Sequence, residues 1–134
     1  MCSPEQAVHT YASAGVYTVS ISGHMSGFGF GQPNGNGDFN KGPDSDKLVD
    51  ILQWGCVKLG NRGGYFYECK KLGALSARDV PDLTETTNLS CMFRDASAFT
   101  SDLSAWNVSS ASNLSWMFDN ASAFQLPAHA PWYH

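Results

Sequence analysis

The chain has 134 residues, 43% of them hydrophobic and 15% charged, and its formal net charge is −4. This length fits one domain, or one domain with a fragment of another. The eight basic residues are scattered, which excludes the basic stripe that nucleic-acid binding requires. No run of apolar residues approaches the length of a membrane-spanning helix, which is about 20 residues.

Residues 1–30 are predicted to form an N-terminal β segment. Val16 to Ile21 alternates between apolar and polar residues and is rich in β-branched side chains, which predicts a strand. His9-Thr10-Tyr11, Gly15 and Tyr17-Thr18-Val19 stand in an order that resembles the last strands of a PKD-like β-sandwich. This resemblance implies a remnant of such a domain, or a strand that caps the first repeat. Because only eight residues precede His9, we expect a piece of a longer protein or a trimmed version of one.

Residues 31–46 are predicted to be a long, mobile loop, because Gly, Asn, Pro and Asp dominate there. Four of its side chains alternate as calcium ligands do: Asn34, Asn36, Asp38 and Asn40. The glycine and the final glutamate of an EF-hand loop are missing, since Phe39 and Ser45 occupy those places. We therefore predict no metal site.

Residues 47–126 are predicted to be a repeat solenoid. The segment from Asn88 to Phe99 returns as Asn113 to Phe124, at an offset of 25 positions. A fixed period of this size is typical of units that are too small to bury their own apolar face and that stack on their neighbours. An older copy lies around Tyr65 to Leu72 at an offset of 27, and a change of offset from 28 to 25 places a three-residue insertion near 78–80.

Each unit is predicted to contain a strand and a short helix. Apolar residues recur at i, i+3, i+4, i+7 and i+10 from Leu89 to Phe99, which is the stripe of a helix. Leu103 to Val108 alternates as a half-buried strand does, and Lys47 to Leu59 is predicted to be the first strand region. The expected fold class is therefore an α/β repeat, a leucine-rich-repeat-like solenoid of short parallel strands and short helices with an N-terminal β segment.

Two motifs carry a family resemblance. Phe66-Tyr67-Glu68-Cys69-Lys70-Lys71-Leu72 is similar to the helix of BspA-type leucine-rich repeats. The order Met92-Phe93, Trp106-Asn107-Val108, Met117-Phe118 resembles the related repeat of about 25 residues found in mycoplasma-type surface lipoproteins. The resemblance implies an extracellular or cell-surface location and, for several family members, a part in adhesion.

Residues 127–134 break the repeat, and their two prolines predict an irregular tail. The four cysteines, Cys2, Cys56, Cys69 and Cys91, lack the C-x-x-C spacing of a zinc site. Cys69 falls at a repeat core position, so we expect a small buried hydrophobe. A Cys56–Cys69 or a Cys69–Cys91 disulfide is the alternative.

The sequence contains no recognisable catalytic group. The four histidines do not cluster with a nucleophile, and no Gly-x-Ser-x-Gly elbow is present. Gly27, Gly29 and Gly31 lack the spacing of a nucleotide-binding loop, so no cofactor is predicted. Four asparagines satisfy the Asn-x-Ser pattern of N-glycosylation: Asn88, Asn107, Asn113 and Asn120. We interpret them as turn or cap residues in preference to glycosylation sites.

Two tryptophans are the candidate partner-binding residues, Trp116 and Trp106. Trp116 stands where the preceding copy has Cys91, and so large a difference in size predicts a position that is not tightly buried. Aromatic residues are enriched at interface hot spots. We therefore expect a non-catalytic surface or secreted repeat module that binds a protein or glycan on a cell surface or matrix. The alternative is a purely structural spacer or capping unit of a longer surface protein.

Overall fold

A computed structural model describes residues 13–21, 28–36 and 38–133. Its two strands are β1 (Gln32–Pro33) and β2 (Phe39–Asn40), which pair antiparallel with Gln32 opposite Asn40 and Pro33 opposite Phe39. The rest of the described chain consists of turns, bends, isolated bridge residues and irregular segments, without a helix. The prediction of an α/β leucine-rich-repeat-like solenoid with short helices and short parallel strands is therefore wrong.

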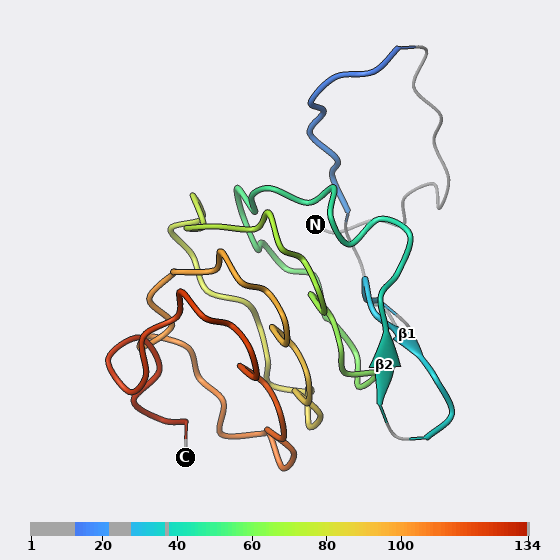
Figure 1. Cartoon of the computed structure of the whole chain (residues 1–134). Coiled ribbons are helices and arrows are strands. Elements are labelled where there is room, and N and C mark those ends of the chain that lie inside the picture. Colours follow the sequence, from blue (N-terminus) through green and yellow to red (C-terminus); the bar gives the residue numbers. More distant parts are fainter. Residues whose placement is uncertain (1–12, 22–27, 37, 134) are drawn as a thin grey trace.

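The internal repeat folds instead as stacked coils of turns (Figure 1). We name the first coil (residues 47–72), the second coil (73–99), the third coil (100–124) and the C-terminal segment (125–133). Backbone N–H groups of one coil donate to carbonyls of the next at 2.8–2.9 Å: Gly64 to Ser90, Phe66 to Met92, Glu68 to Arg94, Leu89 to Asn113, Cys91 to Ser115, Phe93 to Met117 and Asp95 to Asp119. These bonds satisfy the backbone groups that a helix would have paired internally.

Left-handed residues explain why the helical apolar pattern does not produce a helix. Cys91 and Asp95 have φ values of 56° and 60°, and Trp116 and Asn120 repeat this with 59° and 57°. A left-handed residue at every fourth position interrupts the run of right-handed conformations that an α-helix needs. The amide groups between them alternate between two kinds of hydrogen-bond acceptor. Met92 N–H donates to the Leu89 carbonyl of the same coil at 3.3 Å, and Phe93 N–H donates to the Met117 carbonyl of the next coil. The apolar spacing therefore marks the inward side of successive turns.

Stacked phenylalanines form the centre of the core. The rings of Phe66, Phe93 and Phe118 lie 5.5 Å and 5.9 Å apart, with interplanar angles of 16° and 5°. Phe93 is 0% and Phe118 7% exposed, which confirms the prediction that they occupy equivalent buried positions of successive coils. Such offset aromatic contacts add to the stabilisation from burial itself.

The predicted strands of the repeat region are absent from the described structure. Leu103 to Val108 contains a turn at 104–105, and the region from Lys47 to Leu59 holds no named strand. Both regions still supply core residues, because Leu103, Trp106 and Trp54 are buried. Leu103 and Trp106 are three positions apart and Ala105 between them is exposed, so the alternation expected of a half-buried strand does not hold in this segment.

The segment 31–46 is not simply a loop. It contains the hairpin of β1 and β2, and Phe39 on β2 is buried. The chain just before the hairpin bonds to the first coil, because Phe30 N–H donates to Tyr65 at 2.8 Å and Gly31 N–H to Gly64 at 3.1 Å. The predicted loop therefore contains a short hairpin and packs on the coils.

The structure also describes parts of the two ends of the chain. Val16 to Ile21 forms no strand, and residues 13–21 are exposed and lie apart from the coils (Figure 1); residues 1–12 and 22–27 of the expected β segment lie outside the described residues. The C-terminal segment folds onto the third coil, where Tyr133 meets the Phe118 ring edge-on at 5.0 Å. No helix of the described residues is long and apolar enough to cross a membrane.

The cysteines form neither of the predicted pairs. Cys69 and Cys91 carry free thiols, and Cys56 is disulfide-bonded. Cys69 is 0% exposed in the core, which confirms it as a small buried hydrophobe. Burial raises the pKa of its thiol to about 12, and burial also raises the pKa of Cys91.

We expect Cys69 to resist alkylation in the folded protein. With a pKa of about 12, only about one thiol in 10⁴ is ionised near pH 8, and the thiolate is the reactive form. Mass spectrometry after brief exposure to iodoacetamide should find Cys69 unmodified in buffer and fully modified in urea. Equal labelling under both conditions would show that this core position is open.

Candidate binding surface

Three equivalent residues form a column along the stack. Gly64, Cys91 and Trp116 lie at the same place in the first, second and third coils and share left-handed φ values of 60°, 56° and 59°. This conformation is ordinary for glycine but unfavourable for a bulky residue. The backbone of the repeat therefore imposes one geometry on three very different side chains.

The hairpin covers the first two members of this column. A Cβ atom on Gly64 would lie 2.6 Å from the Phe39 ring, so only glycine leaves room for that ring. Phe39 packs with Tyr67, 6.0 Å between ring centroids, and with Cys91. Cys91 is only 2% exposed, so the expectation that its repeat position is loosely buried is wrong for the second coil.

Trp116 is the uncovered member of the column, with 59% of its surface exposed. Its exposure agrees with the prediction for this residue. The position holds a small residue in the two coils where the hairpin covers it and a large, exposed aromatic residue in the third coil. The side of the stack that binds the hairpin thus continues into an open aromatic surface.

Arg94 links the hairpin to Trp116. Its Nη1 donates to both carboxylate oxygens of Asp38, at 2.9 Å and 3.0 Å. Its Nε forms an ion pair with Asp119 Oδ2 at 3.1 Å, without hydrogen-bond geometry. The guanidinium carbon lies 5.4 Å from the centroid of the Trp116 ring, a cation–π contact. We call Trp116, Arg94, Asp119 and Asp38 the Trp116 surface.

Electrostatics keep this arrangement charged near neutral pH. The backbone N–H of Phe39 donates to Asp38 Oδ1 at 2.8 Å. That bond, together with Arg94, holds the pKa of the Asp38 carboxyl below its ordinary value, although desolvation acts in the opposite direction. Two carboxylates therefore flank the guanidinium and fix it against the indole ring.

Trp106, the second candidate, does not reach this surface. It is 7% exposed and lies in the core, where its ring meets Trp54 edge-on at 5.5 Å. Burial removes its ring face from contact with a macromolecular partner. Trp106 is therefore a core residue, and the structure does not bring it together with Trp116.

The polar residues singled out in the sequence serve turns. Three side-chain oxygens accept from the backbone N–H two residues on: Asn88 from Ser90, Asn107 from Ser109 and Asn113 from Ser115. Asn120 takes the left-handed φ that Asn tolerates. Asn34 accepts from Asn36 and Asp38 within the hairpin turn. Among the described residues, no three His, Cys, Asp or Glu side chains lie close enough to share a metal ion.

Comparison with known proteins gives one match. A family model described as "Mycoplasma protein of unknown function, DUF285" matches residues 38–132, which is more than half of the chain. The match begins on the hairpin and extends through all three coils into the C-terminal segment. No curated protein and no solved structure matches.

Proposed function

The chain belongs to the DUF285 family, and we propose that it is a non-catalytic binding module of a surface or secreted protein. Its partner is a protein or glycan on a cell surface or matrix, and the contact is made through the Trp116 surface. The family description names no function, so the proposal depends on the geometry of this surface. The surface or secreted location depends on the resemblance to BspA-type and mycoplasma-type repeat proteins.

The observation that carries the proposal is an exposed tryptophan held in an unfavourable backbone conformation. Trp116 is 59% exposed and has a φ of 59°. Its apolar ring is thus exposed to solvent and its backbone is strained, and burial of the side chain compensates for neither of these free-energy costs. Backbone strain of this kind is found where the surrounding structure enforces it, often at functional sites. Because Arg94 fixes the ring in advance, little side-chain entropy is lost when a partner covers it.

The way in which the hairpin packs on the coils supports the proposal of a macromolecular partner. Phe39 and Asp38 already pack on this side of the stack, one through a ring and the other through a charge. The next position along the column offers the same combination, an aromatic ring at Trp116 beside the charges of Arg94 and Asp119. A partner with apolar and charged groups at similar spacing fits this surface.

We expect Trp116→Ala to weaken partner binding by about 2 kcal/mol or more, about thirtyfold in Kd, as truncation of an interface hot spot does. The experiment is an array of glycans and matrix proteins probed with the wild-type chain and with Trp116→Ala. Leu52→Ala is the matched control, because Leu52 is similarly exposed at 57% and lies in the first coil, away from the third-coil Trp116.

A variant without histidines tests the non-catalytic part of the proposal. Binding should survive replacement of all four histidines, since none belongs to the Trp116 surface. Turnover of an array member that disappears in this variant would contradict the proposal. Binding that Leu52→Ala reduces as much as Trp116→Ala would place the contact elsewhere, and the absence of binding to every member would favour a structural spacer.

A further inference from the structure

On one side of the stack, the backbone bonds between the coils all run in the same direction. Through residues 64–68, 89–95 and 114–120, the N–H group belongs to the earlier coil and the carbonyl to the later one, as in Phe66 to Met92 and in Phe93 to Met117, both at 2.8 Å. Where the second coil meets the third, four third-coil carbonyls accept: those of Asn113, Ser115, Met117 and Asp119. The third coil therefore turns its carbonyls toward the second coil.

This direction leaves the third coil with an edge that consists of hydrogen-bond donors. A trans peptide unit holds its C=O and its N–H on opposite sides, so the N–H of each following residue points away from the second coil. These four N–H groups belong to Leu114, Trp116, Phe118 and Asn120, and no described residue accepts from them. Their second-coil counterparts all donate to the third coil: Leu89, Cys91, Phe93 and Asp95. We call the row of four unpaired N–H groups the donor edge.

The C-terminal segment does not pair with the donor edge. It bonds to the other half of the third coil, where Leu103 N–H donates to His129 at 2.7 Å. Tyr133 contacts the Phe118 ring but accepts from none of the four N–H groups. In Figure 1 the third coil is the last full coil, at the end of the stack away from the hairpin.

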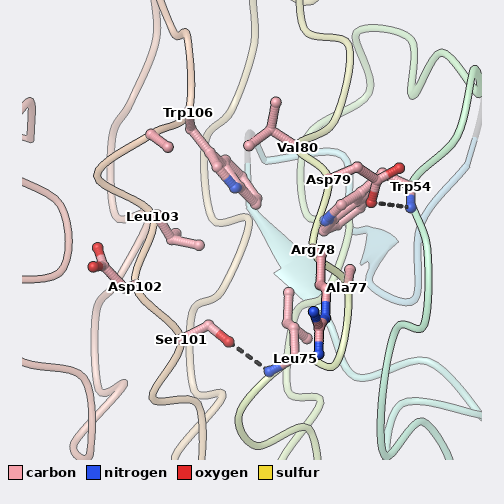
Figure 2. Close-up of a pocket in the computed structure, with 11 residues that line it drawn as sticks. Trp54, Leu75, Ala77, Arg78, Asp79, Val80, Ser101, Asp102, Leu103 and Trp106 are labelled. Atoms are coloured by element: carbon pink, nitrogen blue, oxygen red, sulfur yellow. Dashed lines mark hydrogen bonds between the residues drawn. The ribbon is translucent and has the colours of Figure 1, made fainter.

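The other half of the coils has no comparable row of donors. Figure 2 shows this half, where side-chain oxygens serve as acceptors between coils: Ser101 Oγ accepts from Leu75 N–H, and Asp79 Oδ1 accepts from Trp54 N–H at 2.9 Å. Regular pairing of backbone with backbone is thus a property of the side that ends in the donor edge.

The chain itself covers the opposite end of the stack. Phe30 and Gly31 donate to carbonyls of the first coil. Their own carbonyls are paired as well, since Ser45 Oγ donates to Phe30 at 3.3 Å and Arg62 Nη2 donates to Gly31. In its described part, a second copy of the chain therefore offers no free row of carbonyls at this end, and two donor edges cannot pair with each other.

We propose that the donor edge binds a segment of another protein, which joins the stack as one more coil. Backbone carbonyls at every second residue of that segment accept from the four N–H groups, as the third coil accepts from the second. Main-chain bonds of this kind give affinity when a peptide adds to an open sheet edge. The site consists of backbone groups and goes beyond the proposed contact through the Trp116 ring.

The bound segment has the backbone conformation of the coils. A β-strand also presents N–H groups along the edge that carries its carbonyls, and these would face the donors of the third coil without acceptors. The coils avoid this with a left-handed residue at every fourth position, such as Trp116 and Asn120. A segment that adopts the same turns presents carbonyls alone.

The test titrates the ¹⁵N-labelled full chain with a synthetic peptide of residues 110–124 that carries Trp116→D-Ala and Asn120→D-Ala. A D residue adopts a positive φ without the steric cost that an L residue has. The peptide also carries Phe118→Ala, because Tyr133 already lies against the Phe118 ring of the chain. The matched control peptide has L-alanine at all three positions.

We expect the D-alanine peptide to shift the amide cross-peaks of the four donors saturably. The control peptide should bind at least about tenfold more weakly, because two of its L residues must take the left-handed conformation. In the free chain, amide exchange at Trp116 and Asn120 should be faster than at Cys91 and Asp95, whose N–H groups are bonded to the next coil. Trp116→Ala in the chain keeps its backbone N–H and should still bind the D-alanine peptide, whatever its effect on the partner found on the array.

Three results would overturn the proposal. The first is the absence of a saturable shift at the four amides with millimolar D-alanine peptide, or equal affinity for the two peptides. The second is a shift of these amides with poly-L-glutamate but not with the D-alanine peptide, which would assign the edge to anions. The third is a shift that depends on the concentration of the chain alone, which would assign the edge to a second copy.

Discussion

Phe93→Ala should lower the free energy of unfolding by about 3–5 kcal/mol, as truncation of a large buried aromatic residue does. Its ring is fully buried and stacks on Phe66, Phe99 and Phe118, with centroids 5.5 Å, 4.1 Å and 5.9 Å away. Removal of the Phe93 ring therefore leaves a cavity between the stacked coils, and a shift of one coil alone does not fill it. Urea unfolding followed by circular dichroism measures the change.

The control for this substitution is Leu52→Ala, because Leu52 is 57% exposed and should change stability by no more than about 0.5 kcal/mol. A loss below about 1 kcal/mol for Phe93→Ala would mean that the coils do not depend on the stacked rings.

Gly64→Ala should lower the free energy of unfolding by about 2–4 kcal/mol, through backbone strain at a left-handed φ and overpacking against a ring. The new Cβ would lie 2.6 Å from Phe39 at a φ of 60°. The hairpin must then shift from the coils, which frees Asp38 from Arg94. Urea unfolding gives the loss, and tryptophan fluorescence reports the change around Trp116.

Gly55→Ala separates the two contributions. Gly55 has nearly the same φ, 61°, and nothing lies within 4 Å of its added Cβ. It should therefore show the backbone cost alone, about 1 kcal/mol. Phe39→Ala combined with Gly64→Ala should cost less than the sum of the two single changes, because the clash is then removed. Strict additivity would show that Phe39 does not rest on Gly64.

The stacking could be predicted from the sequence, and the local backbone could not. The return of Met92-Phe93 as Met117-Phe118 predicts equivalent places in successive units, which the phenylalanine stack confirms. The same apolar spacing also fits a helix, because turns with a left-handed residue at every fourth position bury similar positions. Trp116 gives no sign of its left-handed φ, since bulky residues rarely adopt this conformation.

The candidate surface could be predicted in part. The exposure of Trp116 follows from comparison with Cys91, but the burial of Trp106 does not, since alternation alone does not say which side of a segment faces inward. The pairing of Arg94 with Asp38 could not be predicted, because the two residues are far apart in sequence. Gly64 carried a signal: at the offset of 27 it stands where later copies have Cys91 and Trp116, and a glycine there indicates a close approach by another segment.

The most direct test of the binding proposal is the hydrogen-exchange footprint of a partner selected on the array. Amide exchange of the full chain is measured with and without that partner. We predict slower exchange at Ser115–Asn120 and at Asp38, next to the Trp116 surface, and unchanged exchange at 49–53 in the first coil. Protection confined to 49–53, with Ser115–Asn120 unaffected in the bound state, would contradict the account.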